Sequence, residues 1–210
     1  MEVEISDEAL VEKCRQANDM NAFRLLVRRY QNRVFHSAYR MLGNKEEAEE
    51  VVQDTFLKIH QGMDKFRNES TFAAWVFRIS HNMCIDLMRM RRRKKALKLV
   101  RFSTKSSIED LETDLLEGNV QQIADQSLEP GQKLDVKEES KVIESSLFAI
   151  PPAQRAVLVL HDVEGFSYQE ISDIIGASIG TVRSRLHYGR LKLKELLEAY
   201  YSPNQPITPR

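Results

Sequence analysis

Residues 167–197 constrain the fold of this chain more than any other stretch, because they have the pattern of two helices joined by a tight turn. Ser167 and Glu170 have the spacing of a capping box, which marks the start of a helix. Isoleucines follow at helical spacing, and Gly176 stands where the turn often needs a positive φ. Ser178 can cap a second helix. The segment therefore predicts a helix-turn-helix motif.

The second helix of this motif separates apolar from polar residues on a wheel of about 100° per residue. Its apolar side, which includes Val182 and Leu186, is expected to pack on the first helix. The opposite side and its flanks carry Thr181, Arg183, Ser184, His187, Tyr188 and Arg190. Small polar groups suit base edges and arginines suit phosphates, so these six residues are predicted to contact DNA. The alternative is a surface helix with scattered charges that packs in a bundle.

Composition favours a helical protein with room for two small domains. The chain has 210 residues, with only 8 Gly and 6 Pro. Cys14 and Cys84 lack metal-ligand spacing and are expected to be reduced thiols. No apolar run approaches the ~20 residues that span a bilayer, and the first residues do not resemble a signal peptide. We therefore expect a cytoplasmic protein without direct membrane insertion.

Charge is unevenly distributed along the chain, although the formal net charge is zero. Residues 88–108 contain many arginines and lysines and no acid, whereas acids dominate residues 109–139. Such asymmetry indicates nucleic-acid binding by the basic part. The predicted fold is all-α, with two small helical domains joined by a flexible acidic linker. The expected segments are a first domain (8–98), the linker (99–136), a second domain (137–201) and a disordered tail (202–210).

The first domain carries a candidate protein-binding surface on a predicted helix over residues 46–60. One face of this helix is apolar, and the other carries Glu50, Gln53, Asp54 and Leu57. An exposed leucine among acids and amides favours a partner with basic residues. An ordinary solvated face explains the same pattern equally well.

A second candidate surface combines a loop with a long basic helix that begins near residue 71. The loop holds Phe66 and Asn68, and Asn82 lies at the edge of the helix's apolar stripe. An aromatic ring can stack on an unpaired base while an amide reads its Watson–Crick edge. Cations farther along the helix, including Arg89, Arg92 and Arg93, suit the DNA backbone. The alternative is that the aromatic residue is core and the amide a satisfied polar group.

Three segments in this order resemble the sigma-70 family of bacterial RNA polymerase sigma factors, in its short extracytoplasmic-function (ECF) group. Residues 46–61, EEAEEVVQDTFLKIHQ, resemble region 2.2 of the family. Residues 66–93, FRNESTFAAWVFRISHNMCIDLMRMRRR, resemble regions 2.3 and 2.4. Residues 150–196 resemble region 4 and contain the helix-turn-helix. Together with the helix that precedes the first of them, these segments leave only the linker and the two ends of the chain uncovered.

The resemblance implies a protein that binds core RNA polymerase and directs it to promoters of a stress or envelope response. The sequence itself has no nucleophile–base constellation, phosphate-binding glycine loop or metal-ligand cluster, so no catalysis, cofactor or metal is expected. The region 2.2 face would dock on the clamp of the largest catalytic subunit. The loop with Phe66 and Asn68, together with Asn82, would capture a flipped base of the minus-ten element. The recognition helix would read the minus-thirty-five element. An anti-sigma factor that masks these surfaces is a further expected partner.

One departure from the family and two alternatives remain open. Many relatives carry Arg-Ala where this chain has Tyr188-Gly189, which removes a potential guanine reader. A two-domain repressor or activator would bind duplex DNA without polymerase, usually as a two-fold dimer. An interaction protein that occupies polymerase without reading DNA would leave the outer face of the recognition helix expendable.

Overall fold

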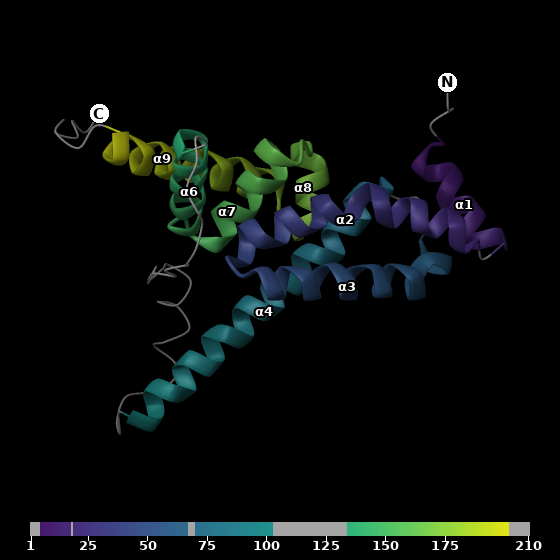
Figure 1. Cartoon of the computed structure of the whole chain (residues 1–210), viewed down its shortest axis with the longest axis horizontal. Helices are drawn as coiled ribbons and strands as arrows, with labels where there is room; N and C mark the ends of the chain where they lie inside the picture. The colour runs from purple at the N-terminus through teal and green to yellow at the C-terminus, as the bar shows by residue number, and fades with distance from the viewer. Residues whose placement is uncertain (1–4, 18, 67–69, 103–133, 202–210) are drawn as a thin grey trace.

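The computed structural model describes residues 5–17, 19–66, 70–102 and 134–201, with the backbone alone for residues 97–102 and 134–140. Helices α1 to α4 form what we call the N-terminal bundle, and α6 to α9 form the C-terminal bundle (Figure 1). The regular elements of these ranges are α1 (Asp7–Ala17), α2 (Met20–Leu42), α3 (Lys45–Gly62), η1 (Met63–Lys65), α4 (Phe72–Phe102), α6 (Leu134–Phe148), α7 (Pro152–Leu158), η3 (Val159–Val163), α8 (Tyr168–Ile175) and α9 (Ile179–Tyr201). The all-α prediction is confirmed.

The ends of the predicted linker are helical. Helix α4 extends to Phe102 and α6 begins at Leu134. Residues 103–133 and the tail 202–210 lie outside the described residues, so their predicted flexibility stays a prediction. Among the described helices, none is both long and apolar enough to cross a bilayer.

Side-chain caps and a glycine set the boundaries of α2 and α3. Asp19 accepts hydrogen bonds from the Asn21 and Ala22 amides at 2.8 and 3.2 Å. Gly43 ends α2 at φ 66°, a left-handed conformation that favours glycine. Asn44 then caps α3. These local signals reverse the chain between α2 and α3 and place the two helices side by side.

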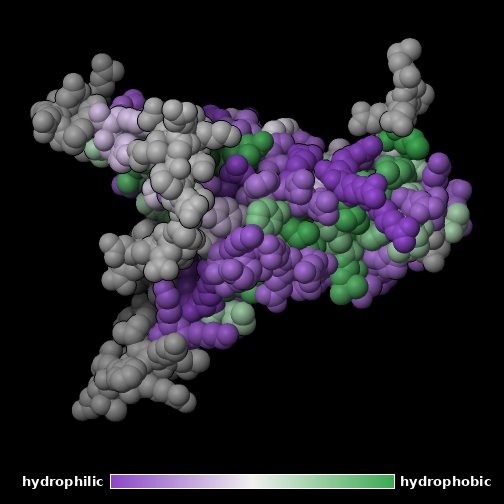
Figure 2. All heavy atoms as spheres, viewed as in Figure 1, coloured by the Kyte–Doolittle hydropathy of each residue, from purple (hydrophilic) through white to green (hydrophobic). Residues whose placement is uncertain are grey.

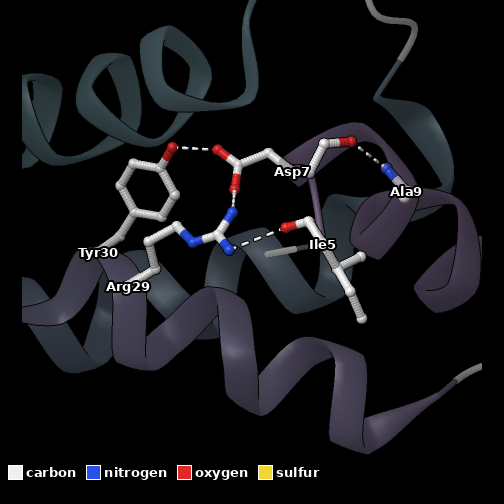
Figure 3. Close-up of polar contacts among 6 residues, drawn as sticks. Ile5, Asp7, Ala9, Arg29 and Tyr30 are labelled. Atoms are coloured by element: carbon white, nitrogen blue, oxygen red, sulfur yellow. Dashed lines mark hydrogen bonds and ion pairs between the residues drawn. The ribbon is translucent and has the colours of Figure 1, made fainter. Parts of the chain in front are cut away.

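The first helix is fixed to α2 by a polar cluster around one carboxylate (Figure 3). Asp7 accepts hydrogen bonds from the Tyr30 hydroxyl and the Arg29 guanidinium. Arg29 also donates to the Ile5 carbonyl at 2.9 Å. Burial and the neighbouring carboxylate raise the pKa of Tyr30, so its hydroxyl stays a hydrogen-bond donor. This cluster anchors α1 by polar contacts, while Leu10 and Val11 anchor it by burial.

The two bundles pack directly against each other. Helix α8 lies along α4, and one cluster of buried apolar side chains continues from Val76 and Phe77 in α4 to Phe166 and Ile171 in the C-terminal bundle. Phe148, at the end of α6, contacts the end of α2, where a Cβ on Gly43 would lie 3.1 Å from its ring. The pair of bundles therefore shares one apolar core.

A glycine within α9 is a site where stability can be raised. A Cβ on Gly189 would lie 3.4 Å from the Gln154 carbonyl oxygen and 3.6 Å from Leu158 Cδ1, both ordinary contacts. Alanine is favoured over glycine inside a helix by about 1 kcal/mol. We expect Gly189→Ala to raise the free energy of unfolding by about 0.5–1 kcal/mol in a denaturant titration. Gly180→Ala, in the same helix, is the control, because a Cβ there would meet only Ser178 Oγ at 3.8 Å and no other helix. A loss of stability specific to Gly189→Ala would show that α7 leaves no room for the methyl group.

Candidate functional site

The helix-turn-helix is built from the capping and turn signals of the sequence. Ser167 Oγ accepts the Glu170 amide at 3.3 Å, and the Glu170 carboxylate accepts the Ser167 amide at 2.9 Å, which completes the capping box. Gly176 ends α8 at φ 65°. Ser178 Oγ accepts the Thr181 amide at the start of α9. The predicted motif is confirmed, with its second helix held at a defined angle by α8.

Apolar packing between α8 and α9 turns the polar face of α9 outward. Ile171, Ile174, Val182 and Leu186 are each at most 2% exposed. On the opposite side, Ser184, His187 and Tyr188 are exposed, with more than half of the Tyr188 side chain accessible. The structure thus presents hydrogen-bonding side chains in a row on the surface of α9, as a helix that reads base edges requires.

The flanking residues of this face already have partners within the protein. The guanidinium of Arg183 lies over the Tyr168 ring, 5.8 Å from its centroid. Arg190 Nε donates to Asp162 Oδ2 at 2.9 Å. Thr181 and Ser178 hydroxyls are 2.9 Å apart. Arg190 would therefore have to release the Asp162 carboxylate before it could bind a DNA phosphate.

The outer face of α3 is a continuous exposed strip. Glu50, Gln53 and Asp54 are exposed, and Leu57 is 55% exposed despite its apolar side chain. The acids also border a groove between α3 and α4, with Val51, Met83, Leu87 and Met90 among its lining residues. An acidic rim beside exposed apolar side chains is complementary to a basic amphipathic helix.

The basic part of α4 projects from the N-terminal bundle. Asn82, Arg89 and Arg93 are exposed, and Arg92 is partly exposed. Figure 2 shows hydrophilic side chains over this stretch of the molecule. One cation of the block is held inside the protein, because Arg91 donates to Glu47 Oε1 at 2.7 Å and to the Leu42 carbonyl at 2.9 Å.

The loop aromatic lies in the core rather than at the surface. Phe66 is 7% exposed and stacks on Trp75 with a ring-centroid distance of 4.8 Å. It also contacts the Phe72 ring edge-on at 5.9 Å. This position favours the alternative given above, in which the aromatic residue belongs to the core. Stacking of the Phe66 ring on a base would require the loop to move. Asn68 lies outside the described residues.

Comparisons with known proteins identify the family. Models of Sigma-70 region 2 and of Sigma-70, region 4 match residues 26–94 and 142–193. The ECF RNA polymerase sigma factor SigW of Bacillus subtilis is 32% identical over 179 residues, which cover 85% of this chain and 90% of SigW. The chain belongs to the ECF group of the sigma-70 family. Members of this family are transcription initiation factors rather than enzymes.

Other relatives of this sigma factor agree with the assignment. ECF RNA polymerase sigma factor SigE of Mycolicibacterium smegmatis is 32% identical over 177 residues, which cover 84% of this chain but 62% of SigE. Among solved structures, CnrH in complex with the cytosolic domain of CnrY has a TM-score of 0.58 at 27% identity, and the match covers 92% of this chain and 97% of CnrH. The sigma factor RpoE in complex with the anti-sigma factor NepR, from Bartonella quintana, has a TM-score of 0.56 at 28% identity. This match covers 83% of this chain and 93% of RpoE.

Sequence reasoning missed the residues that join the two bundles of the sigma factor. Arg33 in α2 binds Glu164 after η3, and the two are 131 positions apart in sequence. His81 in α4 faces the same junction, where burial, and then the charge of Arg185, lowers its pKa to about 4. Neither helical periodicity nor capping signals report a contact between elements so distant in the chain.

Proposed function

We propose that this sigma factor docks on core RNA polymerase through the outer face of α3 and brings it to promoters. The docking face consists of Glu50, Gln53, Asp54 and Leu57. Family membership supports the activity, and the exposed acidic and apolar strip supports the location. The partner surface is expected to be basic and helical, since charge complementarity and an exposed leucine together favour such a partner.

Promoter recognition is divided between the two bundles in this proposal. Helix α9 reads the duplex of the minus-thirty-five element, with Ser184, His187 and Tyr188 toward base edges and Thr181, Arg183 and Arg190 toward phosphates. Helix α4 and the loop before it bind the opened minus-ten element through Asn68, Asn82, Arg89, Arg92 and Arg93. Phe66 joins them only in a state in which the loop has moved its ring out of the core. Binding of unpaired bases by the N-terminal bundle offsets the free energy of opening the duplex. The observation that carries the proposal is the exposed polar face of α9 within a complete helix-turn-helix.

The same proposal extends to the organisation of the chain and to a regulator. Residues 8–98 form the region 2 domain, 99–136 connect it and 137–201 form the region 4 domain. An anti-sigma factor is a proposed partner, supported by the similar sigma factor RpoE, which was solved in complex with the anti-sigma factor NepR. The place of action is the cytoplasm, where polymerase and promoter meet.

Run-off transcription tests the proposal. Core polymerase on a library of random promoter templates is expected to initiate at a defined subset of templates only when the sigma factor is added. Absence of any specific initiation would overturn the function. Sequence-specific duplex binding by a two-fold dimer, without a gain in initiation, would favour the repressor or activator instead.

A triple variant tests the recognition face. Replacing Ser184, His187 and Tyr188 with alanine is expected to reduce initiation at the selected promoters at least about a hundred-fold, because three lost base contacts at ~1–3 kcal/mol each sum to about 3 kcal/mol or more. Tyr200→Ala, which removes a similarly exposed tyrosine at the end of α9, should leave promoter choice unchanged. Unchanged promoter choice by the triple variant would mean that the protein occupies polymerase without reading this element.

A further inference from the structure

The two arginines that flank the recognition face of α9 are held by side chains of the preceding elements. Arg183 and Arg190 lie about two helical turns apart, on the same flank of α9. The Arg183 guanidinium lies 5.8 Å from the centroid of the Tyr168 ring, at the start of α8. Arg190 binds Asp162 in η3, which lies 28 positions earlier in the chain. This flank of α9 is therefore engaged within the C-terminal bundle.

The contact between Asp162 and Arg190 uses both oxygens of the carboxylate. Arg190 Nε donates to Asp162 Oδ2 at 2.9 Å, and Arg190 Nη2 donates to Asp162 Oδ1. Two parallel hydrogen bonds of this kind are the strongest arrangement of a guanidinium and a carboxylate. His161 lies beside the pair, with its Nδ1 3.6 Å from Asp162 Oδ1. The side chains of Asp162 and Arg190 are 31% and 51% exposed, so the pair lies at the surface, where DNA can reach it.

A π-helical turn determines where Asp162 lies. In η3 the Glu164 amide donates to the Val159 carbonyl, five positions earlier, at 3.0 Å. A π-helical turn holds more residues than an α-helical turn, so it changes the direction of the side chains within and after it. Such turns are rare and are frequent at functional sites. Asp162 lies within this turn and reaches the flank of α9, so an irregular backbone and an ion pair coincide at the same residue.

A carboxylate at this place opposes the binding of a DNA phosphate by α9, a step that rests on the proposed function. Asp162 balances the charge of Arg190, so an approaching phosphate meets a neutral pair rather than a free cation. When Arg190 leaves the carboxylate, Asp162 remains unpaired beside the DNA backbone and repels it. The phosphate contact therefore replaces an existing contact of similar kind, and its net contribution to DNA binding is reduced.

We propose that Asp162 competes with the DNA backbone for Arg190 and so limits the affinity of this sigma factor for duplex DNA. Phosphate contacts carry no sequence information, so the competition lowers the affinity for every duplex by a similar factor. Promoter choice stays with Ser184, His187 and Tyr188. Because binding to non-promoter DNA depends on phosphate contacts, the competition shortens the time that the recognition helix spends on the wrong sequences.

Neutralising the carboxylate tests the competition in the full-length protein. Asp162→Asn removes the charge and keeps the size of the side chain. The variant is expected to bind a short random-sequence duplex about three- to ten-fold more tightly than the wild type at about 0.1 M salt, because Arg190 becomes free for a phosphate. The slope of log affinity against log salt concentration should become steeper by about 0.9, the value for one further phosphate contact. Fluorescence anisotropy at several salt concentrations measures both quantities.

Two further variants separate competition from a general effect of charge. In an Arg190→Ala background, Asp162→Asn is expected to change DNA affinity by less than about two-fold, because the arginine that it releases is missing. Glu12→Gln is the matched control, since Glu12 Oε2 lies 3.6 Å from Arg15 Nη1 in α1, at the opposite end of the molecule from α9 (Figure 1). This control frees an arginine with the same change in net charge and should leave affinity within about two-fold of the wild type. Thermal unfolding verifies that each variant is folded.

Promoter preference completes the test. The ratio of affinities for a minus-thirty-five duplex from the transcription library and for the random duplex should be the same in Asp162→Asn as in the wild type. Weaker binding by Asp162→Asn would show that Asp162 orients Arg190 for the phosphate, and would overturn the proposal. Unchanged affinity, a changed ratio, or a gain that persists in the Arg190→Ala background would overturn it as well. Failure of the wild type to initiate transcription would refute the proposed function instead, because binding to the random duplex does not depend on initiation.

Discussion

Core RNA polymerase should bind the Leu57→Asp variant roughly thirty-fold more weakly than it binds the wild-type sigma factor. Leu57 is 55% exposed at the end of the acidic strip on α3. Burial of a leucine at an interface contributes about 2 kcal/mol, which corresponds to this change in the dissociation constant. A carboxylate in its place would also have to be desolvated on binding. A fluorescence titration of labelled sigma factor with core polymerase measures the effect.

The control for Leu57→Asp is another exposed apolar residue, which lies far from α3 in the sequence. Ile143 in α6 is 44% exposed, and Ile143→Asp is expected to bind polymerase as the wild type does. The stability of Leu57→Asp should be unchanged, since the side chain makes little contact with the core. Wild-type affinity in Leu57→Asp would exclude the outer face of α3 as the docking surface.

Phe66→Ala should lower the free energy of unfolding by about 3–4 kcal/mol. The ring is almost completely buried, stacks on Trp75 and meets the edge of Phe72, so alanine would leave a cavity within an aromatic cluster. Thermal and denaturant unfolding of the full chain measure the loss. Phe66→Leu retains most of the apolar volume and should recover a large part of the stability.

Two measurements separate packing from base recognition at Phe66. Binding of a single-stranded minus-ten oligonucleotide is compared in Phe66→Leu and in the wild type at a temperature where both are folded. Equal affinity, together with the loss of stability in Phe66→Ala, assigns the ring to the core. Wild-type stability of Phe66→Ala combined with lost binding would contradict the packing interpretation and assign the ring to an unpaired base.

Local signals in the sequence predicted much of the C-terminal bundle. Ser167 and Glu170 lie within one turn of each other and Gly176 directly follows the last residue of α8, so these local signals determine where α8 begins and ends. The outward position of Ser184 and Tyr188 followed from helical periodicity, which reports which face of a helix is apolar. Helix ends and exposed helix faces can be predicted from sequence because the residues that determine them lie only a few positions apart.

Features that depend on partners distant in the chain could not be predicted in this way. Asp162 binds Arg190, which helical periodicity predicted for a phosphate, and Glu47 binds Arg91 in the basic part of α4, so both cations are engaged within the protein. The contact between the bundles likewise joins α2 to a loop that follows η3. The sequence of a helix shows how many arginines it carries. It does not show which carboxylates from distant parts of the chain will bind those arginines after folding.

The unbroken course of α4 makes the length of this helix matter as much as its composition. The helix has 31 residues, from a core that includes Phe72 to its basic end, and rises about 46 Å at 1.5 Å per residue. Inserting one residue midway would rotate every later arginine by about 100° around the axis, so that the cations would point to a different side of the protein. Insertions of about one full turn would instead preserve the direction of the arginines and shift them outward along the axis. We therefore expect α4 to tolerate changes in length of whole turns better than changes of one or two residues.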